Sequence, residues 1–192
     1  MKLYMHPVST AARPIRLFLA ESGIPCEEEL VDITTGAHHQ EPYASMNPSR
    51  LVPMLDDDGF RLTESSAILK YLAEKYDSPA YPKDLKKRAR VNEVMDWTNT
   101  QLYRDFGYGL VYPQLFPHHK RRSDEAHSGC VEWGQSGARK WLQVLNDHWI
   151  GSHQYLAGDE LTIAENTPLI RFSTKVGKST ACTSPSIVCG LA

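Results

Sequence analysis

The stretch NPSRLVPMLDDDGFRLTESSAILKYL, residues 47–72, decides the fold. Its middle has the pattern of a β-hairpin, because the apolar runs LVPML (51–55) and FRL (60–62) flank the dipeptide DG (58–59), which favours a tight turn. Proline cannot donate a hydrogen bond to a sheet, so Pro53 demands an edge position, a bulge or a cis peptide bond. A proline within a predicted strand contradicts the local preference for strand residues, and such contradictions are expected at functional sites. We therefore interpret Pro53 as a functional residue.

A helix is predicted after the hairpin, from Glu64 onward. Ser65 or Ser66 can lie near its N-terminal cap. The prediction rests on apolar side chains that repeat at helical spacing, namely Ile68, Leu69, Leu72 and Tyr76.

Upstream of the hairpin, the chain has the pattern of strand, helix and strand. Residues 3–5 form a short apolar run, residues 15–19 belong to an amphipathic stretch that Gly23 closes, and residues 27–33 alternate as a half-buried strand does. A polar loop with one irregular helix is expected over residues 36–46. The order βαβ, loop helix, ββα is the arrangement of a thioredoxin-like domain.

Beyond Asp84 the pattern is helical without strand alternation, which predicts an all-helical second domain. Helices are expected over residues 84–115 and 139–149, with the region between them interrupted by glycines. The fold class is therefore an α/β domain followed by an all-α domain. We divide the chain into a thioredoxin-like domain (1–78), a linker (79–85), an all-helical domain (86–165) and an atypical tail (166–192).

The composition excludes several classes of protein. With 192 residues, 41% hydrophobic and 23% charged, the chain is neither disordered nor collagen-like. Its formal net charge is −2, so no positive field recruits nucleic acid or anionic lipid, and a small-molecule or protein partner is expected.

A cytosolic location is expected. The first residues lack the apolar core of a signal peptide, and no apolar run approaches the roughly 20 residues that span a bilayer. The cysteines are scattered, which predicts reduced thiols and neither a disulfide frame nor a metal site: Cys26, Cys130, Cys182 and Cys189.

Four segments resemble the cytosolic glutathione transferases. NPSRLVPML (47–55) and LTESSAILKYL (62–72) are similar to the family signatures N-P-x-x-x-V-P-x-L and L-x-E-S-x-A-I-x-x-Y-L. PVSTAAR (7–13) is similar to the catalytic loop of the theta-like and delta-like serine classes. LAGDELTIA (156–164) resembles the helical-domain L-A-G-x-x-L-T-I-A-D, except that Glu165 stands where the family prefers Asp.

The resemblance implies an enzyme that activates the thiol of glutathione as thiolate for attack on a small hydrophobic electrophile, by conjugation or dehalogenation. It also implies a cytoplasmic homodimer, with glutathione as substrate and no metal. A non-catalytic glutathione-binding or scaffold protein of the same fold is the alternative.

Thiol activation is assigned by the resemblance to Ser9. Its hydroxyl and the N-terminus of the helix that follows could point at the same sulfur anion. Ser9 could instead be a turn or N-cap serine, and Thr10 is kept as a reserve donor.

The glutathione groove is assigned in the same way. A cis Pro53 turns the N–H and C=O of the preceding residue outward, and in the family that residue, by position Val52, pairs with the cysteinyl unit. Arg50 could hold the glycyl carboxylate as a charged donor, or be a solvated surface residue.

Three further residues complete the predicted groove. Glu64 could attract the ammonium group, while Ser65 and the helix N-terminus could hold a carboxylate. The alternative is a plain helix cap. His38 could touch the glycyl end, or lie exposed on its loop.

The electrophile is expected against the helical domain. Tyr103, Phe106 and Leu110 fall at i, i+3 and i+7, with Tyr108 and Tyr112 on an adjacent face. Stripes of this kind are often core instead. The predicted pocket comprises Tyr103, Phe106, Leu110 and Tyr112.

The end of the chain changes character. Thr162 and Glu165 predict a capping box that opens a helix, but residues 166–192 then supply weak helix formers with no apolar period. We interpret this tail as a replacement of the family's helical ending through a frameshift or an altered terminus, with functional divergence as the alternative.

Overall fold

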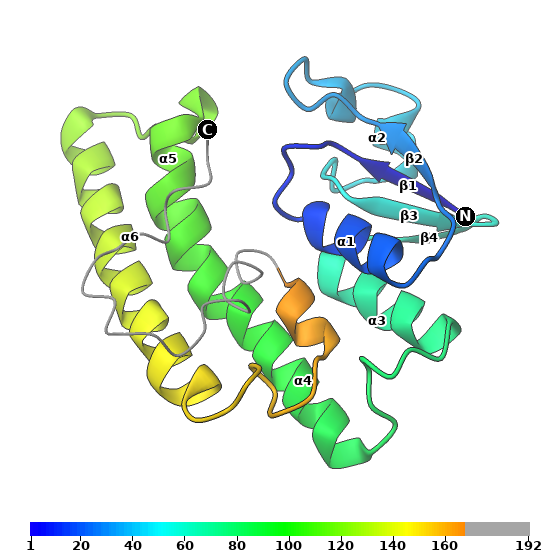
Figure 1. The fold of residues 1–192 in the computed structure, drawn as a ribbon. Coiled ribbons are helices and arrows are strands. Elements are labelled where there is room, and N and C mark those ends of the chain that lie inside the picture. The colour runs from blue at the N-terminus through cyan, green and yellow to red at the C-terminus, as the bar shows by residue number, and fades with distance from the viewer. Residues whose placement is uncertain (168–192) are drawn as a thin grey trace.

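The computed structural model describes residues 1–167, which contain a mixed four-stranded sheet followed by a series of helices (Figure 1). The strand order is β2-β1-β3-β4. β1 is parallel to β2 and antiparallel to β3, and β3 is antiparallel to β4. The strands are β1 (Lys2–Met5), β2 (Glu27–Leu30), β3 (Met54–Asp57) and β4 (Phe60–Leu62). The predicted thioredoxin-like arrangement is confirmed.

β2 lies at the edge of the sheet, and all four of its residues are exposed. The strand expected over residues 27–33 is present at Glu27–Leu30, but its predicted half-burial is wrong there, because three of these four side chains are charged; Val31, just beyond the strand, is buried. Lys2 forms ion pairs with Glu27 at 3.0 Å and with Glu29 at 3.4 Å, and Arg16 pairs with Glu28 at 2.7 Å.

The main core lies between the sheet and two helices, α1 (Arg13–Glu21) and α3 (Ser65–Lys75). Its fully buried side chains come from both layers: Leu3, Ile15, Leu55, Ile68, Leu69 and Leu72. A smaller cluster of Val31, Tyr43 and Met54 lies beneath η1 (Ala37–His39) and α2 (Tyr43–Met46). The irregular helical loop expected over residues 36–46 is thus present.

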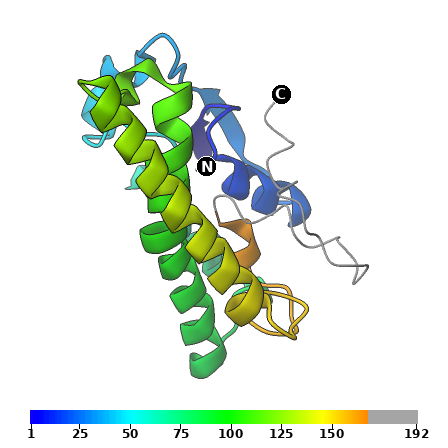
Figure 2. The same cartoon turned by 90° about the vertical axis from the view of Figure 1, so that its left-hand side faces the viewer.

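The helical region contains two long antiparallel rods that lie side by side (Figures 1 and 2). The first is continuous through α4 (Leu85–Trp97), η2 (Thr98–Val111) and α5 (Tyr112–Leu115). η2 has the wider i→i+5 winding of a π-helix. After η3 (Pro117–His119), the second rod is formed by α6 (Asp124–Val144) and η4 (Leu145–Ile150).

The glycines predicted to interrupt this region do not do so, since α6 runs through Gly129, Gly134 and Gly137. The reason is close packing. A Cβ atom on Gly134 would lie 2.3 Å from the carbonyl carbon of Gly109 in η2, and one on Gly137 would lie 2.6 Å from Asp105 Oδ2. Backbone contact between the rods overrides the low helix propensity of glycine.

The predicted capping box is confirmed at η5 (Ile163–Asn166). The carboxylate of Glu165 accepts hydrogen bonds from Leu156 N at 2.7 Å and from Thr162 N at 3.1 Å. η5 packs against α1, α3 and α4, so it joins the two parts of the molecule. It crosses the predicted boundary after residue 165, and the rest of the predicted tail, residues 168–192, lies outside the described residues.

Within residues 1–167, no helix is both long and apolar enough to cross a membrane.

Candidate functional site

The loop between β1 and α1 carries Ser9. A turn fixes the loop, with Ser9 N donating to His6 O at 3.0 Å and Arg13 N donating to Ser9 O at 3.1 Å. Ser9 Oγ accepts from Ala12 N at 3.2 Å, so the serine does cap the helix entry. Its hydroxyl proton has no acceptor among residues 1–167. The capping role and a donor role are therefore compatible.

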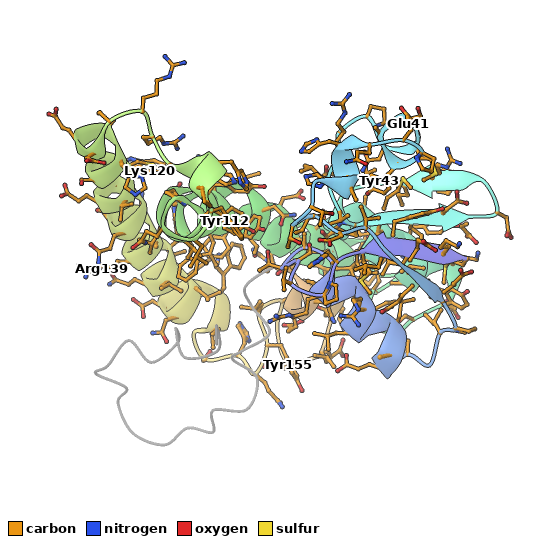
Figure 3. All side chains as sticks on the ribbon, turned by 90° about the horizontal axis from the view of Figure 1, so that it is seen from above. Glu41, Tyr43, Tyr112, Lys120, Arg139 and Tyr155 are labelled. Atoms are coloured by element: carbon orange, nitrogen blue, oxygen red, sulfur yellow. The ribbon has the colours of Figure 1, made fainter. Side chains whose placement is uncertain are left out.

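Thr10 does not offer a spare hydroxyl. Its Oγ1 lies 2.8 Å from the Tyr103 hydroxyl and 3.0 Å from the Tyr112 hydroxyl, and the two tyrosine hydroxyls also contact each other. Figure 3 shows Tyr112 on the helical side of the molecule, with Tyr43 on the sheet side. The loop beside Ser9 is thus bonded directly to η2 and α5.

The structure divides the predicted electrophile pocket. Tyr103 and Tyr112 meet, together with the Tyr108 ring, whose centroid lies 5.5 Å and 4.9 Å from theirs. The sequence placed Tyr112 on a helix face adjacent to that of Tyr103, and in the structure the hydroxyls of the two residues are in contact, in a segment that is wound more widely than an α-helix. Phe106 packs against the main hydrophobic core, and Leu110 is half-buried. Burial, Tyr112 and the carboxylate of Glu64 raise the pKa of Tyr108.

The segment before β3 contains a cis peptide bond between Val52 and Pro53, one of the three options that the sequence left open. Two side chains hold the preceding carbonyl: Leu51 O accepts from the Tyr43 hydroxyl at 2.5 Å and from Asn47 Nδ2 at 2.7 Å. The main chain of Val52 makes no hydrogen bond within the described part of the chain. It therefore offers an N–H and a C=O to an extended ligand.

Arg50 lies exposed beside this segment. Its backbone is left-handed, with φ of 53°, and its N–H donates to Asn47 O at 2.9 Å. No carboxylate of residues 1–167 forms an ion pair with it. The guanidinium can accordingly receive a carboxylate from a ligand.

The N-terminus of α3 presents a strained residue and an uncapped end. Glu64 has φ of 65° and ψ of 116°, a conformation that side chains with a Cβ rarely adopt, and no side chain caps the helix. Residues held in such conformations cluster at ligand sites. Ser65 Oγ donates to Ala11 O at 2.9 Å, so its proton goes to the loop of Ser9 and not to a carboxylate as predicted. The first-turn N–H groups still make an anion site.

His38 is half-buried in η1, with its Nδ1 atom buried and unpartnered. Its ring centroid lies 3.9 Å from that of His39. Burial, His39 and His118 of the helical region lower the pKa of His38, so the ring is neutral at pH 7. It can contribute a hydrogen bond to a ligand, but no charge.

Two asparagines that help to position the site were not predicted from the sequence. Asn99 Nδ2 donates to Ser66 Oγ at 3.3 Å and connects η2 to α3. Nothing in the sequence distinguishes Asn99 from other polar residues of a helix, so this contact could not be predicted. Asn47 is 1% exposed and belongs to the quoted signature, so its place in the motif was the available signal.

These groups share one end of the sheet. Tyr4 of β1 pairs with Met54 of β3, so the loop after β1 and the segment before β3 leave the sheet together. The bond from Ser65 to Ala11 brings the start of α3 to the same place. Main-chain donors, a helix N-terminus, a free guanidinium and a serine hydroxyl suit an extended anionic peptide. No cluster of three or more potential metal ligands occurs among the described residues.

Comparisons with known proteins agree with this chemistry. Residues 1–74 match the family model of the glutathione S-transferase N-terminal domain. The chain is 32% identical to human glutathione S-transferase theta-1 over 179 residues, which cover 92% of this chain and 74% of the relative. It is 35% identical to human theta-2 over 167 residues, covering 86% and 67%. The crystal structure of human theta-2 with glutathione and an unknown ligand superimposes with a TM-score of 0.75 at 34% identity, covering 86% of this chain and 68% of that one.

Proposed function

Because this chain belongs to the glutathione S-transferase family, we propose that Ser9 carries its central chemical step, the stabilisation of glutathione as thiolate. The protein is a glutathione transferase, and glutathione is its substrate. A cysteine-type thiol with a pKa near ~8.5 is only about a few per cent ionised at pH 7. Lowering that pKa by about two units, worth roughly 2.7 kcal/mol, makes thiolate the major form.

The observation that carries this proposal is the unused proton of Ser9. The oxygen is held in place by Ala12 N–H at 3.2 Å, while the hydroxyl hydrogen has no acceptor within residues 1–167 and can donate to a sulfur anion. A donor of this kind favours only the charged form of the thiol. Ser9 therefore lowers the activation barrier of the reaction more than it increases the affinity for glutathione.

For the grip on glutathione, we propose a main-chain pairing with Val52 before Pro53. The free N–H and C=O of Val52 suit the cysteinyl unit as an added strand would. Arg50 takes the glycyl carboxylate, since its guanidinium is exposed and has no ion-pair partner within residues 1–167. His38 adds an uncharged contact at the same end.

The γ-glutamyl end is assigned to the start of α3. Glu64 attracts the ammonium group, and the first-turn N–H groups stabilise the α-carboxylate by about 0.3 to 1 kcal/mol. Ser65 contributes its N–H and, through Ala11, the position of the loop.

The electrophile is expected to be small and hydrophobic and to be conjugated or dehalogenated. Tyr103 on η2 and Tyr112 on α5 contact Thr10 of the loop that carries Ser9, which supports a pocket that includes these two residues. Phe106 and Leu110 belong to the proposed pocket through their positions on the same helix.

We also propose a cytosolic homodimer. Cys26 and Cys130 are free thiols, as suits a reducing compartment. We retain the division into a glutathione-binding domain (1–78), a linker (79–85) and a helical domain (86–165), since α3 ends at Lys75 and α4 begins at Leu85. Light scattering should give twice the 21.7 kDa of one chain.

The test is a pH titration of glutathione bound to the protein, followed by the ultraviolet absorbance of the thiolate. Ser9→Ala should stay on glutathione-agarose, raise the midpoint toward ~8.5 and lower the turnover of an aryl halide by about 100-fold. Ser128→Ala, an exposed serine on α6, is the matched control. An unchanged midpoint in Ser9→Ala would remove the serine from this role.

A further inference from the structure

We propose that Tyr103 and Tyr112 are positioning residues, which act through Thr10 to hold the loop that carries Ser9. We call the three side chains the hydroxyl clamp. This inference rests on the proposed function of that loop in thiol activation. It gives the two tyrosines a task other than lining the electrophile pocket.

The three hydroxyls of the clamp are hydrogen-bonded to one another. Each of its three oxygens lies within hydrogen-bond distance of the other two, with Thr10 at 2.8 Å from Tyr103 and 3.0 Å from Tyr112. A hydroxyl carries one proton and two lone pairs. When the three bonds run in one direction around the ring, each hydroxyl donates once and accepts once, and all three protons are used inside the clamp.

The winding of η2 is what lets the clamp close. Tyr103 and Tyr112 are nine residues apart. An α-helix turns by about 100° per residue, which would put them on roughly opposite sides of the rod. The i→i+5 winding over Thr98–Val111 has more residues per turn and brings both rings to one side. Such winding is rare and occurs frequently at functional sites.

The clamp acts next to the proposed donor. Two side-chain ties hold the loop immediately after Ser9: the clamp at Thr10, and the bond from Ser65 Oγ to Ala11 O at 2.9 Å. A misplacement of ~1 Å in a reacting group can cost about 100-fold in rate. The clamp therefore couples the seating of the helical region to the position of the Ser9 hydroxyl.

The clamp also stays intact over the range in which glutathione ionises. Burial, followed by the neighbouring Tyr112, raises the pKa of Tyr103 well above its ordinary range. The Tyr103 hydroxyl is thus protonated wherever the substrate thiol titrates.

Two variants remove the clamp and keep its shape. Thr10→Val keeps the branched side chain without the hydroxyl, and the double variant Tyr103→Phe/Tyr112→Phe keeps both rings. Thr10→Ser retains the hydroxyl. Tyr76→Phe, an exposed tyrosine at the end of α3, is the control for loss of a phenol.

Thr10→Val and the double phenylalanine variant should each raise the thiolate midpoint of bound glutathione by about one pH unit. They should lower kcat about tenfold while the KM for an aryl halide stays within about twofold. Thr10→Ser and Tyr76→Phe should keep the wild-type midpoint. Combining Thr10→Val with the double variant should add little, because both remove the same interaction.

The clamp is overturned if Thr10→Val and the double variant keep the wild-type midpoint, whether or not the KM for the aryl halide rises. A rise in that KM alone would identify the tyrosines as pocket walls. Ser9→Ala, measured in parallel, separates the two proposals. If it leaves the midpoint unchanged while the clamp variants raise it, the serine assignment fails, and the clamp positions the loop but not through the Ser9 hydroxyl.

Discussion

The two sides of the proposed glutathione site are built by different means. On the sheet side, unusual backbone conformations present the binding groups: left-handed Arg50 and Glu64, and the main chain of Val52 before a cis proline. On the helical side, the backbone is helical throughout, and aromatic rings are aimed by the winding of η2 and by the packing of η2 on α6. The first side depends on local geometry, and the second on contacts between distant segments.

This difference indicates how each side should respond to mutation. A change that alters one side chain on the sheet side should reach the ligand and leave the rest of the fold in place. A change between the rods should lower the stability of the fold before it alters glutathione binding. Three substitutions test this separation.

The largest effect is expected for Gly134→Ala, which places a methyl group 2.3 Å from the carbonyl carbon of Gly109. Overpacking of this kind should lower the free energy of unfolding by about 1 to 3 kcal/mol, measured by urea denaturation. The KM for glutathione should stay within about twofold.

Gly129→Ala is the matched control on the same helix, since nothing lies within 4 Å of its added Cβ. It should stabilise α6 by about 0.5 to 1 kcal/mol. Equal stability of the two alanine variants would show that the rods separate freely and that close packing does not decide this region.

A smaller effect is expected for Arg50→Ala, on affinity and not on stability. Loss of a charged donor remote from the sulfur should raise the KM for glutathione about tenfold and leave kcat within about twofold. Calorimetry with glutathione should report the same loss of affinity. Arg139→Ala on the exposed face of α6 is the control, and wild-type affinity in both variants would reject the groove assignment.

The smallest effect is expected for Glu64→Gly, which links the two responses at one residue. Glycine relieves the strained backbone, so the free energy of unfolding should rise by up to ~1 kcal/mol, while the KM for glutathione should also rise. Asp58→Gly, at φ of 53° in the β3–β4 turn, is the control and should stabilise the protein without changing that KM. A fall in stability for Glu64→Gly would mean that its side chain stabilises the unliganded fold.

The sheet side could be predicted well from the sequence because its determinants are local. The DG turn, the proline before β3 and the capping box at Thr162 each act within a few residues, and each was found where expected. The fold class and the resemblance to glutathione transferases were inferred from the same local motifs.

The features that could not be predicted depend on contacts between residues far apart in the chain. The exposure of β2 follows from its place at the sheet edge, and the continuity of α6 follows from the fit of its glycines against η2. The acceptor for the Ser65 hydroxyl lies 54 residues away, at Ala11. The meeting of Tyr103 and Tyr112 needed a helix period that the 3.6-residue pattern does not contain.

The edge strand β2 has a consequence for the behaviour of many copies together. An exposed sheet edge offers unpaired main-chain groups to a strand of another molecule, and charged side chains on the edge oppose such pairing. Glu27, Glu28 and Glu29 place three carboxylates in succession along this edge. Although Lys2 and Arg16 pair with them, these charged side chains would have to be accommodated by any second copy that docked there edge to edge, and they therefore oppose extension of the sheet from one molecule to the next.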